Sequence, residues 1–285
     1  MVSPNYTDGV GVQEFPVQAM SAARPRAFVG VVGTDAESLL QRLLSNDVAA
    51  LGPGESCDAL LLTAKARVIA PLRVLRRAKD DFLLWTEPEL GERLRGEILR
   101  MRFAAKAEVE LEDHRSYVLL GPEARLPEGS TALPTAEYGV PGWEVLDERP
   151  DAPRDELDRD RLEAMRIRAC TPRYGREIDD RVLPAEAGLV ERAVSFTKGC
   201  YPGQEPIARL HYRGHANRGL RVLELESSEL PAYDAEVDLD GKTVGRVTSA
   251  VREADGRIVA LAYVRREVPK DADLRVGSAA ARSLD

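Results

Sequence analysis

The sequence predicts an α+β protein that ends in a small antiparallel β-barrel. Between residues 59 and 111, short apolar runs typical of strands surround a segment of helical periodicity. From residue 218 onward, apolar and polar residues alternate in several runs, which are separated by the tight-turn dipeptides Asp240-Gly241 and Asp255-Gly256. A region of strands and a helix, followed by a region that contains only strands, is typical of an α+β chain with a C-terminal barrel.

The first helix is expected after a loose arm and one strand. Residues 1–25 are polar and rich in turn formers, and an apolar run then ends at Gly33. Thr34 and Glu37 have the spacing of a capping box, which predicts a helix start. One face of that helix carries Leu39, Leu40, Leu43 and Leu44. Gly30 and Gly33 lack the spacing of a phosphate-binding loop, and a strand-to-helix turn needs such glycines in any case.

Strands and helices are expected to alternate along the middle of the chain. Apolar runs predict strands at Ala59–Thr63, Val68–Leu75, Phe82–Trp85, Ala107–Leu111, Ser116–Gly121 and Trp143–Leu146. Helical periodicity predicts helices at Glu87–Phe103 and Arg154–Arg168. A further helix is expected to begin after Gly203, because Pro206 is tolerated in a first turn. The rest of Pro122–Pro153 is expected to be loop.

Composition restricts the class of protein. Of the 285 residues, 44% are hydrophobic and 31% are charged, which is typical of a globular protein with real cores. The formal net charge of −8 argues against a dedicated nucleic-acid binder. No apolar run is long enough to span a bilayer, and the N-terminal residues do not resemble a secretory signal. We therefore expect a cytoplasmic protein that acts without nucleic acid or membrane.

Cys57, Cys170 and Cys200 are an odd set of cysteines without a CxxC pair. A disulfide framework is not expected from this pattern, which fits a reducing compartment. The same count excludes a zinc or iron–sulfur site held by four thiolates of one chain.

The stretch Lys198–Glu205, which reads KGCYPGQE, is the strongest candidate for chemistry. Cys200 lies between turn formers and charge rather than in an apolar run. Lys198 supplies a cation nearby, and the helix expected after Gly203 supplies backbone N–H groups, both of which favour a thiolate. The alternative is a loop cysteine that only packs, as free cysteines commonly do. Packing is the role we expect for Cys57 and Cys170.

Two further blocks carry side chains that could bind a ligand or could simply be solvated. Carboxylates able to accept the paired N–H donors of an aminopyrimidine are Glu177, Asp179, Asp180 and Glu186. Guanidinium groups able to bind carboxylates or phosphates are Arg209, Arg213, Arg218 and Arg221. His211 and His215 lie four residues apart, but Gly214 between them and the lack of an HExxH glutamate argue against a metal site.

At KGCYPGQEPIARL the sequence resembles the YgfZ family of folate-binding proteins, which is implicated in iron–sulfur cluster assembly or repair. That family is similar to the T-protein (aminomethyltransferase) of glycine cleavage. The likeness runs from about Phe28 to Val264. The blocks LLSNDVAAL, YGREIDD, LPAEAGL, GRVTSAV and IVALAYVRR occur in the expected order.

The resemblance implies a T-protein-like ring of three domains, with ferredoxin-like α+β parts and a C-terminal antiparallel β-barrel, around a folate pocket lined by the cysteine motif. We expect a discontinuous folate-binding domain at 26–55 plus 112–210, a ferredoxin-like domain at 56–111 and the barrel at 211–285. The implied cofactor is tetrahydrofolate or a derivative. The implied partners are iron–sulfur proteins or their assembly machinery, and no metal or stable cluster is expected on the chain itself.

The expected site residues are those that match the family's motif. Cys200 and Lys198 are expected to carry the chemistry, and the remaining motif residues are Gly199, Tyr201, Gly203, Gln204 and Glu205. The expected folate contacts are Tyr174, Asp179, Glu186 and Arg209.

Two departures from the relatives bear on mechanism. T-proteins carry an acidic pair where this chain has Ala70 and Pro71, so electrostatic assistance to methylene transfer is missing. Arg168 stands where a glutamate is expected to contact the pterin, a role that Glu186 or Asp179 could take. The leading hypothesis is a non-enzymatic tetrahydrofolate-binding accessory protein for iron–sulfur proteins. The alternatives are a folate-dependent aminomethyltransferase or other one-carbon transferase, and an interaction scaffold that has lost folate.

Overall fold

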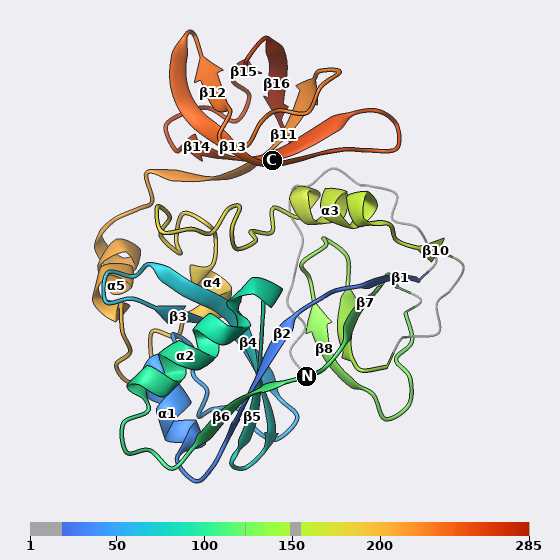
Figure 1. Cartoon of the computed structure of the whole chain (residues 1–285). Coiled ribbons are helices and arrows are strands. Elements are labelled where there is room, and N and C mark those ends of the chain that lie inside the picture. The colour runs from blue at the N-terminus through green and yellow to red at the C-terminus, as the bar shows by residue number, and fades with distance from the viewer. Residues whose placement is uncertain (1–18, 123, 149–154, 285) are drawn as a thin grey trace.

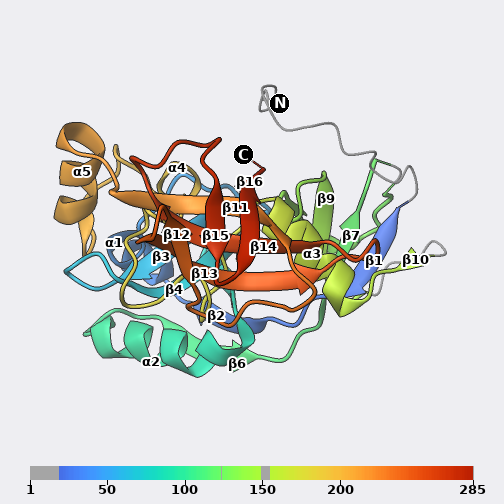
Figure 2. The same ribbon diagram turned by 90° about the horizontal axis from the view of Figure 1, so that it is seen from above.

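The computed structural model of the protein describes residues 19–122, 124–148 and 155–284. Three parts lie around a common centre: a sheet with two helices, a second sheet, and a closed β-barrel (Figure 1). Seen from above, the barrel lies across the junction of the other two parts (Figure 2). The predicted α+β class with a C-terminal barrel is confirmed.

The first part is a five-stranded sheet in the order β3-β4-β5-β2-β6, with helices packed on one face. The strands are β2 (Ala27–Val32), β3 (Ser56–Leu62), β4 (Val68–Ala78), β5 (Asp81–Thr86) and β6 (Glu108–Glu112). The helices are α1 (Ala36–Leu43) and α2 (Gly91–Met101), the latter after a short 3-10 turn, η1 (Pro88–Leu90). The leucines predicted on one face of α1 are buried in the core beneath this sheet.

The boundary expected at residue 56 does not follow the sheets. Strand β2 forms antiparallel pairs with β5 and β6. Residues 27–32, expected with 112–210, therefore share a sheet with 56–111.

The capping box expected at the start of α1 is wrong. Asp35 precedes the helix, and its side chain makes no capping hydrogen bond but accepts from the backbone N–H of Lys106 at 2.8 Å. Glu37 pairs with Arg76 at 2.7 Å instead of reaching back to the chain before the helix. Partners distant in sequence have replaced the local ones.

The second part is a sheet in the order β10-β1-β7-β9-β8. Its strands are β1 (Met20–Ala23), β7 (Ser116–Leu120), β8 (Thr131–Thr135), β9 (Gly142–Leu146) and β10 (Asp155–Glu156). The expectation of a loose arm is wrong for residues 20–23, because Met20 is buried and pairs with Leu120; residues 1–18 lie outside the described part of the chain.

Strand β8 was expected to be loop. It contains Pro134, which is tolerated because β8 is an edge strand.

Helix α3 (Arg159–Arg168) lies between the second sheet and the barrel. Asp158 caps it by accepting from the N–H of Arg161 at 2.7 Å, so the helix begins later than expected; residue 154, the expected start, lies outside the described residues. Ala164 and Ile167 pack against the barrel, while other α3 side chains pack against the second sheet.

The barrel closes in the order β11-β14-β13-β12-β15-β16. Its strands are β11 (Arg218–Glu226), β12 (Glu236–Leu239), β13 (Lys242–Arg252), β14 (Ile258–Arg265), β15 (Leu274–Val276) and β16 (Ala279–Ser283). Asp240 and Gly241 join β12 to β13 with φ of 51° and 75°, the positive values that a tight hairpin turn requires.

The segment after α3, with α4 (Val190–Ala193) and α5 (Gln204–Arg213), packs the first sheet onto the barrel. Tyr263 of β14 lies in the same cluster as Leu60 of β3 and Ile207 of α5. The Tyr263 hydroxyl donates to the carbonyl of Glu177 at 2.8 Å. Within the described part of the chain, no helix is long and apolar enough to cross a membrane.

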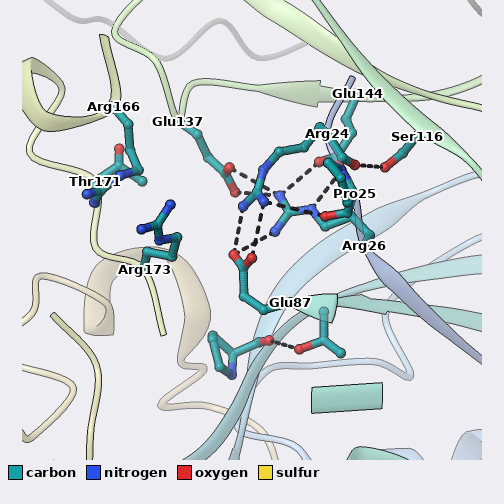
Figure 3. A network of polar contacts seen from close by, with 12 residues as sticks. Arg24, Pro25, Arg26, Glu87, Ser116, Glu137, Glu144, Arg166, Thr171 and Arg173 are labelled. Atoms are coloured by element: carbon teal, nitrogen blue, oxygen red, sulfur yellow. Dashed lines mark hydrogen bonds and ion pairs between the residues drawn. The ribbon is translucent and has the colours of Figure 1, made fainter. Parts of the chain in front are cut away.

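A buried ion-pair network joins the two sheets where the chain passes from β1 to β2 (Figure 3). The Arg26 guanidinium contacts Glu144 at 2.8 Å, Glu87 at 3.0 Å and Glu137 at 3.1 Å. Arg24 contacts Glu87 at 2.7 Å. Glu87 follows β5 of the first sheet, whereas Glu144 lies in β9 of the second sheet and Glu137 in the connection between β8 and β9. The two guanidiniums therefore hold the sheets together, and Arg26 fixes the position of Glu137.

The network also sets the charge of Glu137. Burial alone would raise the pKa of Glu137, but Arg26 and Arg24 outweigh burial and lower it to about 2. Burial would also raise the pKa of Glu87, but Arg26 and Arg24 outweigh burial and lower it below its ordinary value. Both carboxylates are therefore ionised at neutral pH.

The lowered pKa of Glu137 predicts a pH dependence of stability. Such a carboxylate stabilises the fold above its unfolded pKa, and the stabilisation is lost as the pH falls through the folded value, here between about pH 5 and pH 2. Glu137→Gln should be less stable than wild type at pH 7 and lose less stability over that acid range. Thermal unfolding across pH measures this. Glu128→Gln, exposed in the same segment, should follow wild type, and a Glu137→Gln curve parallel to wild type would contradict the assignment.

Candidate functional site

A cavity of about 620 Å³ lies where the three parts of the molecule meet. The first sheet contributes Asp58 of β3 and Arg73 of β4, and the second sheet contributes residues 134–137. Residues 169–172 after α3, residues 185–188 with Arg192, and residues 219–220 of β11 complete the walls. Because every part supplies a wall, the cavity exists only in the assembled fold.

One side of the cavity is lined by an ion pair from the first sheet, Asp58 with Arg73. Arg73 lies 3.2 Å from Asp58 and donates to the carbonyl of Pro134 at 2.6 Å, which connects the first sheet to the second. Arg192 lies 3.9 Å from Asp58. Arg73 and Arg192 could therefore bind an anionic group of a ligand.

The other charged lining residues are two glutamates. Glu137 is the ionised end of the network in Figure 3. Glu186 pairs with Arg218 of the barrel at 3.0 Å and accepts from the N–H of Leu183 at 2.9 Å. Carboxylates held in this way are good acceptors for paired N–H donors.

Lys198 does not lie where a cation that activates Cys200 would be expected. Its ammonium group donates to the carbonyls of Gln41, Leu44 and Asn46 at 2.5, 2.6 and 2.9 Å, at the C-terminal end of α1. A cation in that position is stabilised by the unpaired carbonyls and the helix dipole. Burial lowers the pKa of Lys198 to about 8. Lys198 therefore joins the motif to the first sheet.

Cys200 itself is exposed, as its setting in the sequence suggested. None of the described residues that line the cavity belongs to the 198–205 motif. The expectation that the cysteine motif lines the central pocket is therefore not met by this cavity. Cys170, expected only to pack, does line it and also packs against the barrel core, whereas Cys57 packs against the core of the first sheet as expected.

The glycine and tyrosine of the motif have structural roles. Gly203 has a φ of 81° and lies so close to the turn after β3 that a Cβ would be 2.6 Å from the carbonyl oxygen of Thr63. Tyr201 is buried in the cluster around Leu60 and Tyr263, and burial raises its pKa to about 12. Its hydroxyl is buried without a hydrogen-bond partner among the described residues. Gln204 and Glu205 begin α5, which confirms the helix expected after Gly203.

Of the four expected folate contacts, the structure places only Glu186 in the cavity wall. Tyr174 accepts from Arg93 of α2 at 2.6 Å. Asp179 pairs with Arg181 at 2.7 Å and lies 3.6 Å from Arg246 of the barrel. Arg209 is exposed on α5.

The acidic block after α3 is not simply a solvated loop. Glu177 is fully buried and bonds Arg166 at 3.0 Å and Ser249 of the barrel at 2.7 Å. Arg168, the residue in place of the expected glutamate, donates through its Nε to Glu253, which follows β13, at 2.6 Å. Both interactions attach α3 and its following segment to the barrel.

Four charged residues in the described walls of the cavity were not predicted from the sequence: Asp58, Arg73, Glu137 and Arg192. Arg73 has a detectable signal, because it interrupts an apolar strand and a buried charge requires a partner. Glu137 has none, since it lies in a segment rich in proline and glycine whose strand was not recognised.

The position of Lys198 predicts that its loss affects stability rather than thiol chemistry. Lys198→Met keeps the apolar stem but removes the donors to three carbonyls, which should lower the free energy of unfolding by about 1–3 kcal/mol. Cys200→Ser, at an exposed position, should change it by less than about 0.5 kcal/mol. Denaturant unfolding compares the two. Unchanged stability of Lys198→Met would show that the three contacts are dispensable.

No protein-family model matches this chain. Curated relatives cover most of it: a protein from Shigella sonnei named tRNA-modifying protein YgfZ is 26% identical over 290 residues, covering 88% of this chain and 86% of its own. The protein of the same name from Edwardsiella ictaluri is 28% identical, covering 87% and 85%. An uncharacterized protein from Haemophilus influenzae is 23% identical, covering 87% and 89%.

A solved structure has the same fold. Glycine cleavage system aminomethyltransferase T from Bartonella henselae matches with a TM-score of 0.79 at 20% identity, covering 93% of this chain and 84% of that one. The chain is thus similar over most of its length to proteins named tRNA-modifying protein YgfZ and has the fold of a glycine-cleavage T-protein, which confirms the resemblance expected from the KGCYPGQE motif.

Proposed function

We propose that the protein binds a reduced folate, tetrahydrofolate or a derivative, in the central cavity and acts as an accessory protein for iron–sulfur enzymes. The cavity at the junction of the three parts carries this proposal, because it combines carboxylates, among them the ionised Glu137, with guanidinium groups in a T-protein-like fold. The likeness to YgfZ proteins supports the same function.

The cavity has the size and chemistry for such a ligand. Its volume falls within the roughly 300–1,000 Å³ usual for small-molecule sites. The aminopyrimidine edge of a pterin presents paired N–H donors, for which Glu186 and Glu137 are suitable acceptors. Arg73 and Arg192 are suitable partners for a carboxylate of the ligand.

A methylene-transfer step is not part of the proposal. Ala70 is buried in β4, and Pro71, which follows it, supplies a carbonyl that accepts from Thr86 at 2.7 Å, so neither position offers a carboxylate. An aminomethyltransferase stays the second candidate, because the solved structural neighbour has that activity in its name. Measurement of methylenetetrahydrofolate formation from an aminomethylated lipoyl carrier protein separates the two, and we expect none.

The partner we propose is an iron–sulfur enzyme that modifies tRNA. The relatives' name points to tRNA modification. The net charge of −8 favours an indirect role, in which this protein serves the modifying enzyme rather than holding tRNA itself. The exposed thiol of Cys200 is accessible to such a partner.

Calorimetric titration with tetrahydrofolate tests the ligand. Wild type and Cys200→Ala should bind alike, because Cys200 is not part of the cavity wall. Glu186→Gln should bind about tenfold more weakly, since a hydrogen bond to a charged group is lost. Asp180→Asn, exposed in the same loop, serves as the control and should bind normally. A wild type that binds no reduced folate would refute the proposal, and full affinity of Glu186→Gln would remove Glu186 from the site.

The role of the thiol is tested in a strain that lacks the protein. We expect Cys200→Ala to fold and bind folate but fail to restore the activity of a cluster-dependent tRNA-modifying enzyme. Thr197→Ala, an exposed neighbour in the chain, should restore it. Complete rescue by Cys200→Ala would exclude the thiol from the mechanism.

A further inference from the structure

A second cavity of about 730 Å³ lies directly beside the first, along the edge of the barrel. The two cavities share Ala185, Gly219 and Leu220 as walls. The remaining walls of the second come from residues 215, 216, 218 and 221 and from residues 264 and 266–270, at and after the end of β14. We call this second cavity the barrel groove.

The barrel groove is basic in a chain that is acidic as a whole. Among the described residues, its cationic walls are Arg218, Arg221, Arg266 and Lys270, and Glu267 is the one carboxylate. Glu267 lies 3.8 Å from Arg265, which is outside the groove, and is therefore partly neutralised.

The charges of the groove are only partly compensated by the described residues. Arg218 pairs with Glu186, the carboxylate on the wall of the first cavity. Arg221 bonds the carbonyls of Pro269 and Val268, which are neutral acceptors. Arg266 and Lys270 are exposed. Three positive charges are thus available to an anion that enters the groove.

The shared wall leaves room at Gly219. A Cβ built there meets no atom within 4 Å, so the space beside this residue is open. A ligand bound in the first cavity could therefore extend past Gly219 into the groove without moving the backbone.

We propose that the barrel groove binds the poly-γ-glutamyl tail of a folate whose pterin occupies the first cavity. This inference rests on the proposed function and adds the ligand class, a polyglutamylated rather than a monoglutamyl folate. Each added glutamyl unit contributes one carboxylate, and guanidinium and ammonium groups are its natural partners. An RNA backbone is the other polyanion to consider, but the continuity with the first cavity and the acidic surface charge favour the folate tail.

The test compares tetrahydrofolate with one and with five glutamyl units by calorimetry at low salt. Wild type should bind the pentaglutamate about tenfold more tightly, because each exposed ion pair strengthens association by roughly two- to fivefold and at least two can form. The gain should shrink in 0.5 M salt, where exposed charges are screened. Arg266→Ala combined with Lys270→Ala should remove most of the gain while leaving the monoglutamate affinity unchanged.

A matched control removes the same amount of charge elsewhere. Lys79→Ala combined with Lys242→Ala affects two exposed lysines that line neither cavity, and it should keep the full gain. Equal binding of both folates to wild type, or a gain that survives in the Arg266/Lys270 variant, would overturn the inference while the proposed function stands. A groove that binds single-stranded RNA through Arg266 and Lys270, with no preference for the pentaglutamate, would also overturn it. If neither folate binds, the proposed function fails as well.

Discussion

The buried ion pairs around Arg24 and Arg26 are the constraint on which the rest of the structure depends. Three carboxylates and two guanidiniums lie together between the sheets, and Arg26 contacts all three carboxylates. Removal of Arg26 would leave Glu137 and Glu144 buried without their closest cation, which is strongly destabilising. The partners come from both sheets, so the charges can be satisfied only when the sheets are docked. Since Glu137 belongs to this network and to the cavity wall, docking of the sheets and formation of the site are one event.

The thiol motif and the cavity are separate features of the molecule. Lys198 and Gly203 fasten the motif to α1 and to the turn after β3, and Tyr201 is buried beneath it. These contacts leave Cys200 exposed on the surface. Lys198, Tyr201 and Gly203 therefore have structural roles in the motif, and Cys200 is its exposed thiol.

Much of the fold could be predicted because its signals are local. Strands such as β4 and β5 are apolar runs with β propensity, and the Asp-Gly turns of the barrel require conformations that few residues adopt. Predictions failed where distant partners took over. In place of the predicted capping box, Asp35 bonds the backbone of Lys106 and Glu37 pairs with Arg76. Strand β8 was not predicted because it contains Pro134. The site was harder to predict from the sequence than the fold, because its walls come from segments far apart in the chain. Spacing along the sequence does not show which charged side chains lie close together.

The burial of Tyr263 has a consequence for how the molecule could be divided. Its ring belongs to the cluster that holds α5 and β3, under the guanidiniums of Arg218 and Arg246, and its hydroxyl serves the backbone of Glu177. A fragment that stops before β11 would not merely be shorter. It would have a cavity where the Tyr263 ring packs, and the backbone carbonyl and carboxylate of Glu177 would lose their hydrogen bonds from Tyr263 and Ser249. The barrel therefore completes a hydrophobic core that it shares with the rest of the molecule. A recombinant fragment without the barrel would not reproduce the packing of the full-length protein.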